Sequence, residues 1–314
     1  MSSDIKRFLL LPHIKIHNAN ALSSPYTIGF PAMTAWLGAV HALQRKLNAK
    51  SFEVLFSGVA VTSHQVDLHT YRGADDFVSS IIGTANPLDK TGARSAFIEE
   101  ARCHLQVSLL IEIIDFNIDV KEEFLEQVDF LLNAQMKIAG GDIQTFNPPE
   151  ILVVEHGNEK DKAKVIRKLM PGYTLIERRE LMLEGMKHGK DGIDALLDYL
   201  AIHHHCEQSD KHKVLWHSKR KTFDDQSIGW VVPIATGFQG VSNIAEAKNQ
   251  RDPEKPHRFA ESIVTLGEFK MPYRFDSIED MLWRYHYDQE NGLYLCQQQK
   301  HASPTQNSIS NEFD

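Results

Sequence analysis

The sequence is poor in cysteine and has no long hydrophobic run. Its three cysteines, Cys103, Cys206 and Cys296, are scattered and odd in number, which argues against a disulfide framework and favours a reducing compartment. No apolar run approaches the roughly 20 residues of a membrane-spanning helix, and the first residues lack the apolar core and cleavage site of a signal peptide. We therefore expect a cytoplasmic protein without membrane contact.

Positive charge is also scarce. The 34 lysines and arginines are outnumbered by 42 aspartates and glutamates, so the formal net charge is −8. This balance argues against a protein that coats nucleic acid by bulk electrostatics. The chain has no Gly-x-Ser-x-Gly elbow, no Walker loop and no Gly-x-Gly-x-x-Gly fingerprint. Any nucleic-acid contact must therefore come from local geometry or from a partner, and we predict no cofactor.

Hydrophobic periodicity in the first half of the chain predicts the order strand, helix, strand, strand, helix, strand. In the first strand, for example, apolar Ile14 and Ile16 alternate with polar neighbours. This order is that of a ferredoxin-like βαββαβ domain, which RNA-recognition domains share with many unrelated proteins. We therefore predict an α+β fold. The expected elements are residues 8–18, 31–47, 52–66, 101–114, 122–137 and 142–146.

The rest of the chain has weaker periodicity. Residues 69–98 carry several glycines and an Asn-Pro pair without a regular pattern, so we expect an excursion between two strands, such as a long hairpin. In the second half we predict helices at 161–170 and 193–202 and a strand at 229–237. Residues 301–314 are polar, so we expect a disordered tail.

Residues 18–31, between the first predicted strand and the first predicted helix, contain small polar residues, a glycine, prolines and aromatics but no charged residue. A loop of this composition can hold a defined shape and present uncharged hydrogen-bonding groups. The N-terminal amides of the following helix would point at its ligand. We therefore expect an anionic backbone to bind here.

The third predicted strand places Arg102 and His104 on one face and Cys103 on the other. An arginine and a histidine side by side suit phosphate or base contact better than proton transfer. A plain Arg–Glu pair on the sheet surface is an alternative of about equal weight. The strand lacks the aromatic signature of RNA-recognition domains and offers no ring on which to stack a base. An RNA ligand would therefore be held by loops at the edge of the sheet.

A histidine cluster, His203–His205, precedes Cys206. Consecutive histidines point in different directions, and their spacing matches no structural zinc pattern. We therefore predict a solvated helix end here and no metal site.

The basic run at 211–221 surrounds Trp216 with cations, among them Lys219 and Arg220. Surfaces that bind single-stranded nucleic acid combine cations for phosphates with an aromatic ring for a base. A basic surface loop with a partly buried tryptophan accounts for the pattern equally well. We therefore treat these three residues as possible nucleic-acid contacts.

Several stretches, in one order along the chain, are similar to one known family. They are residues 18–31 with the helix that follows, 86–92, 99–105, 139–141, 169–173, 229–234, 258–261, 266–269 and 281–286. Over roughly residues 8–296 the chain resembles the second Csy subunits of type I-F CRISPR surveillance complexes. These belong to the repeat-associated mysterious protein (RAMP) superfamily and bind the 5′ handle of the guide RNA. The order and spacing of the stretches carry the resemblance, and no single motif does.

The resemblance implies a ferredoxin-like RAMP domain at residues 1–150 with a thumb hairpin inserted at about 69–98. A C-terminal α/β extension at 151–300 would complete the fold, followed by the tail at 301–314. It also implies no catalysis, because in this system a separate endoribonuclease cuts the precursor RNA and a recruited helicase-nuclease degrades the target. The implied partners are the guide RNA, the large Csy subunit as a heterodimer partner, the first backbone Csy subunit and, through the complex, target DNA.

The resemblance places the contacts with the RNA handle on three segments. They are Asn18, Asn20, Ser23 and Ser24 in the opening loop, Arg102 and His104 on the strand, and Lys90 and Arg94 on the thumb. Two alternatives stay open. One is a metal-independent endoribonuclease of the same superfamily, which would process CRISPR precursor RNA with His17 or His104 as its general base. The other is a protein–protein adaptor that uses the sheet.

Overall fold

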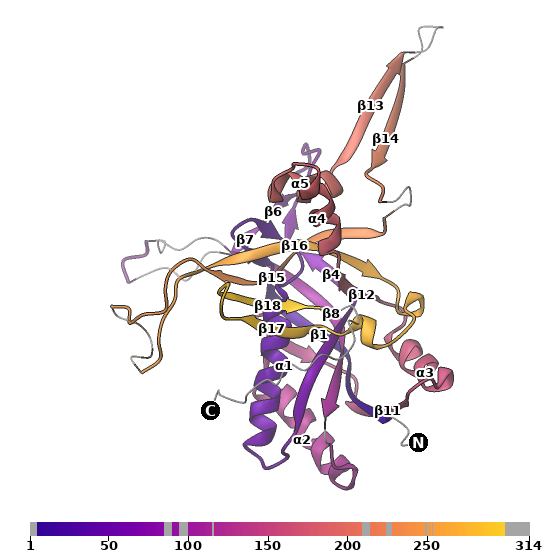
Figure 1. The fold of residues 1–314 in the computed structure, drawn as a ribbon, viewed down its shortest axis with the longest axis vertical. Coiled ribbons are helices and arrows are strands. Elements are labelled where there is room, and N and C mark those ends of the chain that lie inside the picture. The colour runs from indigo at the N-terminus through magenta and orange to yellow at the C-terminus, as the bar shows by residue number, and fades with distance from the viewer. Residues whose placement is uncertain are drawn as a thin grey trace.

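The protein is built on one large antiparallel sheet. A computed structural model describes residues 5–84, 90–93, 100–114, 116–208, 214–223, 228–248, 250, 252 and 254–298. The sheet curls around helix α1 (Met33–Asn48), which contacts β4, β9, β15 and β18 (Figure 1). Its strands follow the order β17-β18-β15-β16-β12-β4-β8-β1-β10-β9, with β11 beside β1 and β7 beside β8.

The strands of this sheet differ widely in length. Their bounds are β1 Ile5–Asn20, β4 Leu55–Leu68, β7 Gly83–Thr84, β8 Glu100–Ile114, β9 Lys137–Ile138, β10 Gly141–Thr145, β11 Glu150–Glu155, β12 Tyr173–Glu177, β15 Trp230–Gly240, β16 Ala260–Lys270, β17 Arg284–Asp288 and β18 Leu293–Gln297. Three separate two-stranded pairs join β2 to β3, β5 to β6 and β13 to β14. They span Leu22–Ser24, Thr27–Ile28, Thr70–Tyr71, Ser80–Ile81, Ile202–Gln208 and Val214–Arg220.

The helices are few and short. Besides α1 they are α2 Lys121–Ala134, α3 Glu159–Leu169, α4 Arg179–Lys187 and α5 Gly192–Leu200, with 3-10 turns at Ile118–Val120, Pro272–Arg274 and Glu279–Met281. Among the described residues, no helix has the length and apolar content that crossing a membrane requires.

The α+β class predicted from the sequence is confirmed as an antiparallel sheet with a few helices. The six elements expected in the first half correspond to β1, α1, β4, β8, α2 and β10. Helix α2 ends at Ala134, earlier than predicted, because Lys137 and Ile138 pair with β10 as strand β9. Strands β11 and β12 and helix α4 were not predicted, since their short apolar runs show no clear period.

Strand β8 lies between β1 and β4 and pairs with both along most of its length. Its odd-numbered residues from Cys103 to Ile113 belong to the main hydrophobic core, together with Trp36 of α1 and Phe124 of α2. Each fully buried aliphatic side chain of this kind stabilises the fold by about 1.5–3 kcal/mol. This burial fixes which residues of β8 face the other way.

The opposite face of β8 is covered over only part of its length. Leu110 packs with Phe8 of β1 beneath Leu169 of α3 and Leu282 of the C-terminal segment, in a second hydrophobic cluster. Toward the N-terminal end of β8 this face carries polar side chains instead, and none of them belongs to the cluster. The helices and turns therefore leave one part of the sheet open.

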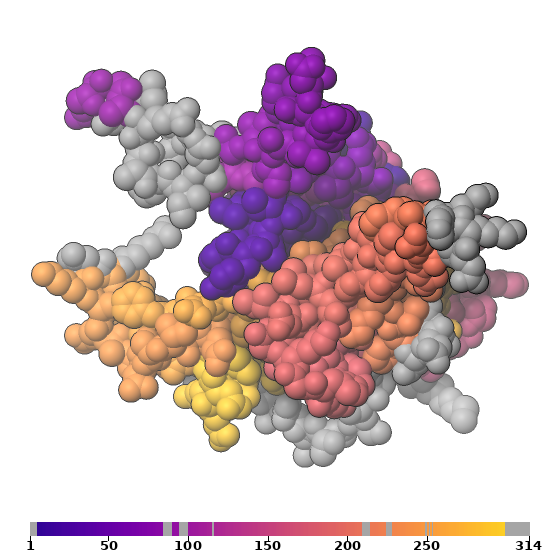
Figure 2. Space-filling model, turned by 90° about the horizontal axis from the view of Figure 1, so that it is seen from above, coloured from indigo at the N-terminus to yellow at the C-terminus, as the bar shows by residue number. Residues whose placement is uncertain are grey.

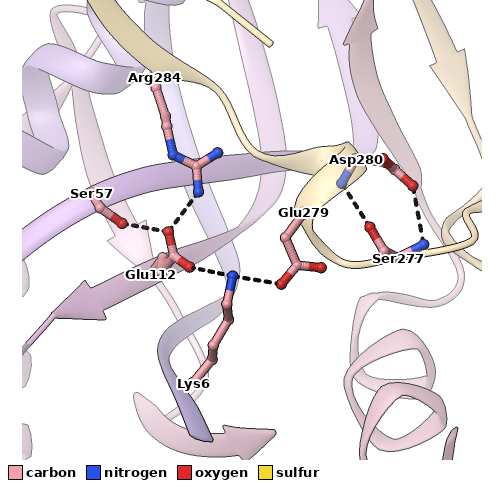
Figure 3. Close-up of polar contacts among 7 residues, drawn as sticks. All are labelled: Lys6, Ser57, Glu112, Ser277, Glu279, Asp280 and Arg284. Atoms are coloured by element: carbon pink, nitrogen blue, oxygen red, sulfur yellow. Dashed lines mark hydrogen bonds and ion pairs between the residues drawn. The ribbon is translucent and has the colours of Figure 1, made fainter. Parts of the chain in front are cut away.

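A largely buried ionic cluster fixes the C-terminal segment to the sheet (Figure 3). Glu112 of β8 accepts hydrogen bonds from Ser57 Oγ at 2.5 Å and from Arg284 Nη2 at 2.6 Å. Lys6 Nζ lies 3.2 Å from Glu112 Oε1 and 2.8 Å from Glu279 Oε1. Burial alone would raise the pKa of Glu112, but the Ser57 hydrogen bond and the charges of Arg284 and Lys6 outweigh it and hold the pKa below 4.5.

Helices α4 and α5 pack on β16 and β15, and the hairpin β13–β14 projects beyond them (Figure 1). Every described residue of this hairpin is exposed. His203–His205 lie on β13, so the predicted helix end is wrong: α5 ends at Leu200, and Ile202 onward pairs with β14. The histidine run has no apolar side for a continued helix to bury, whereas strand pairing does not need one.

The segment predicted as a loop at 18–31 is more regular than expected. Asn18 and Asn20 end strand β1, and Asn18 adopts a left-handed φ of 58°. The hairpin β2–β3 follows, and Thr27 Oγ1 lies within hydrogen-bond distance of two serine hydroxyls of β2. The segment is therefore held in shape by its own backbone pairing and hydroxyl groups.

Removing the charge of Glu112 should destabilise the fold. Glu112→Gln keeps the side-chain shape but removes the carboxylate that Arg284 pairs with and leaves Lys6 with Glu279 alone, and breaking a buried pair in this way costs about 3 kcal/mol. Denaturant unfolding of the purified chain measures the loss. Glu159→Gln is the control. Its exposed carboxylate forms an ion pair with Lys162 at 3.5 Å, and its loss should change the free energy of unfolding by less than about 1 kcal/mol. Equal losses in both variants would contradict a special role for Glu112.

Candidate nucleic-acid interface

A hollow of about 580 Å³, lined by polar and small apolar residues, opens at the N-terminal end of β8. Its walls come from the end of β1, the hairpin β2–β3, the turn between β9 and β10 and one side of α1. Three of the predicted site residues, Asn20, Ser23 and Arg102, line it together. The wall formed by α1 consists of small residues, namely Ala35, Gly38, Ala39 and Ala42.

Arg102 presents an incompletely paired guanidinium to this hollow. Its Nη2 donates to Glu100 Oε2 at 2.5 Å, so the Arg–Glu pair weighed in the sequence does form. Its Nη1 lies 3.5 Å from the carbonyl oxygen of Asn18. Its Nε is buried and has no hydrogen-bond partner among the described residues. The Arg102 side chain as a whole is 22% exposed, so an anionic oxygen of a ligand would meet the outer N–H groups of the guanidinium through charge-assisted hydrogen bonds.

The two asparagines shape the wall of the hollow. The Asn20 side-chain carbonyl accepts a hydrogen bond from the backbone N–H of Leu22 at 2.9 Å, and the Asn20 backbone N–H donates to Ala139 at 2.8 Å. The side-chain carbonyl of Asn20 is thus committed to the turn into β2, which leaves the amide nitrogen for a ligand. Asn18 precedes Asn20 by two residues on β1, and its backbone N–H donates to His104 Nδ1 at 3.1 Å.

The two serines lie in different surroundings. Ser23 lines the hollow, and its hydroxyl is 2.8 Å from Thr27 Oγ1. Ser24 is buried, its hydroxyl is 2.7 Å from the same Thr27 oxygen, and it also accepts a hydrogen bond from the backbone N–H of Tyr26. Ser23 therefore faces the hollow, while the buried Ser24 stabilises the β2–β3 hairpin.

Next to Arg102 on the same face of β8, His104 joins a histidine cluster from three segments. The ring of His17 stacks on that of His104 with a centroid distance of 4.3 Å. His69 Nε2 lies 3.0 Å from His104 Nε2. Because the Asn18 backbone N–H occupies His104 Nδ1, the neutral ring of His104 carries its proton on Nε2 and donates it to His69.

A second histidine pair continues this polar surface along the sheet. His13 and His64 stack at 4.2 Å, His64 Nε2 lies 2.7 Å from Ser108 Oγ, and Gln106 Nε2 lies 3.1 Å from His13 Nδ1. The prediction that the third strand offers no ring for a base considered that strand alone, whereas the neighbouring strands bring imidazole rings onto the same face. The rings are imidazoles, and most come from strands other than β8. Sequence reasoning missed them because His13, His64 and His69 are far apart in the chain.

The other predicted contacts lie elsewhere or outside the described residues. Lys90 is exposed and does not line the hollow, and Arg94 lies outside the described part of the chain. Trp216, Lys219 and Arg220 lie on β14 of the projecting hairpin (Figure 1). Trp216, of which 68% is exposed, pairs with Cys206 across this ribbon. These residues form a surface separate from the hollow.

Lys137 also lines the hollow and was not predicted as a site residue. It forms an ion pair with Asp142 at 2.7 Å across the β9–β10 turn. The close approach of β10 to β1 needs Gly141, because a methyl group there would lie 2.8 Å from the carbonyl oxygen of His17. The Gly140–Gly141 pair was the signal in the sequence that marked this turn. Among the described residues, no group of histidine, cysteine or acidic side chains forms a metal site.

Comparison with known proteins places the chain in a family. Residues 9–296 match the family model described as CRISPR-associated protein (Cas_Csy2). The chain is also 33% identical over 319 aligned residues to the CRISPR-associated protein Csy2 of Pseudomonas aeruginosa (strain UCBPP-PA14), covering 93% of this chain and 95% of that protein. The chain belongs to the Csy2 family. The resemblance found in the sequence is confirmed, and the match to this family runs from β1 to β18 and includes every residue that lines the hollow.

The histidine cluster should make folding stability depend on pH. Burial first, and then repulsion from His69 and His17, lower the pKa of His104 below 6.5, although Asp67 opposes them. The folded state therefore binds fewer protons than the unfolded state near this pH. The contribution of neutral His104 is complete above pH 6.5 and is lost as the pH falls through the folded pKa.

His104→Gln should reduce the loss of stability between about pH 7 and pH 5. The measurement is the free energy of unfolding of wild type and variant across this range. His188→Gln, at the exposed end of α4, is the matched histidine control and should keep the wild-type slope. An identical pH dependence in wild type and His104→Gln would show that His104 does not hold the neutral state described here.

Proposed function

We propose that the chain is a non-catalytic subunit of a type I-F CRISPR Csy complex that binds the 5′ handle of the guide RNA in the cytoplasm. The observation that carries this proposal is the partly exposed guanidinium of Arg102, which lines a hollow together with Asn20 and Ser23. Membership of the Csy2 family gives the class of complex. An RNA phosphate is the anion that such a subunit would hold at this arginine.

The central strands support a ferredoxin-like domain of the RAMP type. Strands β10, β1, β8 and β4 are neighbours in this order, and α1 and α2 pack on the same face of them. Numbered along the chain, this is the 4-1-3-2 order of a βαββαβ domain. The connection from β4 to β8 contains the short pair β5–β6, where the thumb is expected. Residues 151–300 would then be the C-terminal extension that completes the fold.

The small number of cations in the hollow is compatible with a subunit that binds only a few nucleotides. Arg102 and Lys137 are the cations among the described residues that line the hollow. A protein that neutralises two or three phosphates shows a salt slope of only about −1.4 to −2.1. The imidazole of His17, exposed at the edge of the histidine cluster, can stack on a base, a contact worth about 1–3 kcal/mol. The net charge of −8 is therefore compatible with local RNA binding.

Within the complex we propose that the chain pairs with the large Csy subunit, abuts the first backbone Csy subunit and meets target DNA through the assembled complex. These partners follow from the family and from the modest charge of the hollow, which leaves much of the binding energy to other subunits. The adaptor alternative shares these protein contacts but gives Arg102 no role in RNA retention.

A metal-independent endoribonuclease is the second candidate, and the stacking of His17 on His104 is the observation in its favour. General base catalysis needs a ring nitrogen that is free to take a proton. His104 has both ring nitrogens engaged, by Asn18 and by His69. His17 is then the better candidate for a base. The occupied ring of His104 favours the non-catalytic role.

Arg102→Ala should weaken the retention of guide RNA by the assembled complex. Loss of a hydrogen bond from a charged group costs about 1.5–3 kcal/mol, which is about ten-fold to a hundred-fold in affinity. The measurement is the RNA content of the purified complex together with RNA affinity at several salt concentrations, where the slope should fall by about 0.7. Arg167→Ala, on the exposed side of α3, is the matched arginine control. Unchanged RNA retention in Arg102→Ala would favour the adaptor.

The purified chain should not cleave CRISPR repeat RNA at a specific site. Incubation with labelled repeat RNA, followed by analysis of the products on a denaturing gel, measures this directly. Specific cleavage that disappears in His17→Ala or His104→Ala would establish the endoribonuclease and overturn the proposed function.

A further inference from the structure

A second arginine, Arg258, also has a buried Nε without a hydrogen-bond partner among the described residues. It lines a different polar hollow, of about 460 Å³, where β15 and β18 meet their outer loops. Figure 2 shows the orange segment that includes this region at the periphery of the molecule. Glu290 lines the same hollow without forming an ion pair with Arg258. Among the described residues, the fold thus holds this cation in place without an ion-pair partner.

Two glycines make room for this arginine. The backbone N–H of Gly240, the last residue of β15, donates to the carbonyl oxygen of Gly292, just before β18, at 2.8 Å. A methyl group on Gly240 would overlap Arg258 Cδ and lie 2.9 Å from Nε, and one on Gly292 would also collide with the guanidinium. The arginine therefore lies across the bare backbone of both glycines. This packing fixes its position before any ligand binds.

A row of exposed aromatic side chains runs across the sheet beside this arginine. Phe238 of β15 pairs directly with Tyr294 of β18, which pairs directly with Tyr287 of β17. Directly paired residues share one face of a sheet, and Gly240 shares that of Phe238 because it follows by two residues. The exposed fractions of Phe238, Tyr294 and Tyr287 are 40%, 39% and 51%. The row and Arg258 therefore form one continuous surface.

We propose that this surface, Arg258 with Phe238, Tyr287 and Tyr294, is a protein-docking site that receives an aspartate or glutamate of another subunit. Aromatic residues and arginine dominate the centres of protein interfaces. A nucleic-acid site would need several cations, but Arg258 is the only lysine or arginine among the described residues lining the hollow. A single carboxylate satisfies one guanidinium. The inference rests on the proposed role as a subunit of a larger complex.

The test is co-expression of the tagged full-length chain with the large Csy subunit, the first backbone Csy subunit and a guide RNA. Arg258→Ala should lower the retention of one of the two protein subunits about ten-fold or more, with or without nuclease treatment. Gly240→Ala should do the same, because its methyl group displaces the arginine while the charge remains. Arg167→Ala on α3 is the control and should retain both subunits.

Each other outcome decides against the docking site. Wild-type retention of both subunits by Arg258→Ala and Gly240→Ala would overturn it, and loss of RNA alone would identify a nucleic-acid contact instead. A large fall in the melting temperature of the isolated Arg258→Ala chain would show that the arginine stabilises the fold and is not an unpaired group awaiting a partner. If the wild-type chain retains neither subunit, the proposed function itself fails, and the docking site fails with it.

Discussion

The alternation of side chains along β8 is the constraint on which the rest of the structure depends. The strand is paired on both sides, and its odd-numbered residues fill the main core against α1 and α2. A shift of one residue would bury Arg102 and His104 and expose Cys103 and Leu105, so the register is fixed by hydrophobic burial. The polar residues of the site therefore gather on one face because the core occupies the other.

The face of β8 opposite the main core is covered near its C-terminal end and uncovered near its N-terminal end. Near its C-terminal end the strand carries Leu110 and Glu112, which lie beneath α3 and the C-terminal segment. The Glu112 cluster holds that segment through ion pairs, and the backbones of Val59 and Trp283 exchange hydrogen bonds beside it. Near its N-terminal end the same face carries Arg102, which lines the hollow, and His104, whose ring nitrogens are engaged by Asn18 and His69. One strand thus provides both the anchor of the C-terminal half and the candidate interface.

Local periodicity was sufficient to predict the six main elements of the first half but not the short strands such as β2, β3 and β9. Strand alternation correctly separated Arg102 and His104 from Cys103. Local periodicity does not predict contacts between segments that are distant in the chain. The stacking of His17 on His104 and the lining of the hollow by Lys137 depend on the register between β1, β8 and β10. The hairpin β13–β14 was missed because its residues are exposed on both faces and leave no period to detect.

The central claim is that the guide-RNA handle lies in the hollow beside Arg102. The most direct measurement is photo-crosslinking of the assembled complex with 4-thiouridine in the RNA handle, followed by mass spectrometry of the crosslinked peptides. The account predicts crosslinks to peptides that contain residues 17–24, 100–106 or 137–140, which surround the hollow. Crosslinks confined to the hairpin β13–β14, or absence of this chain from the crosslinked products, would contradict it.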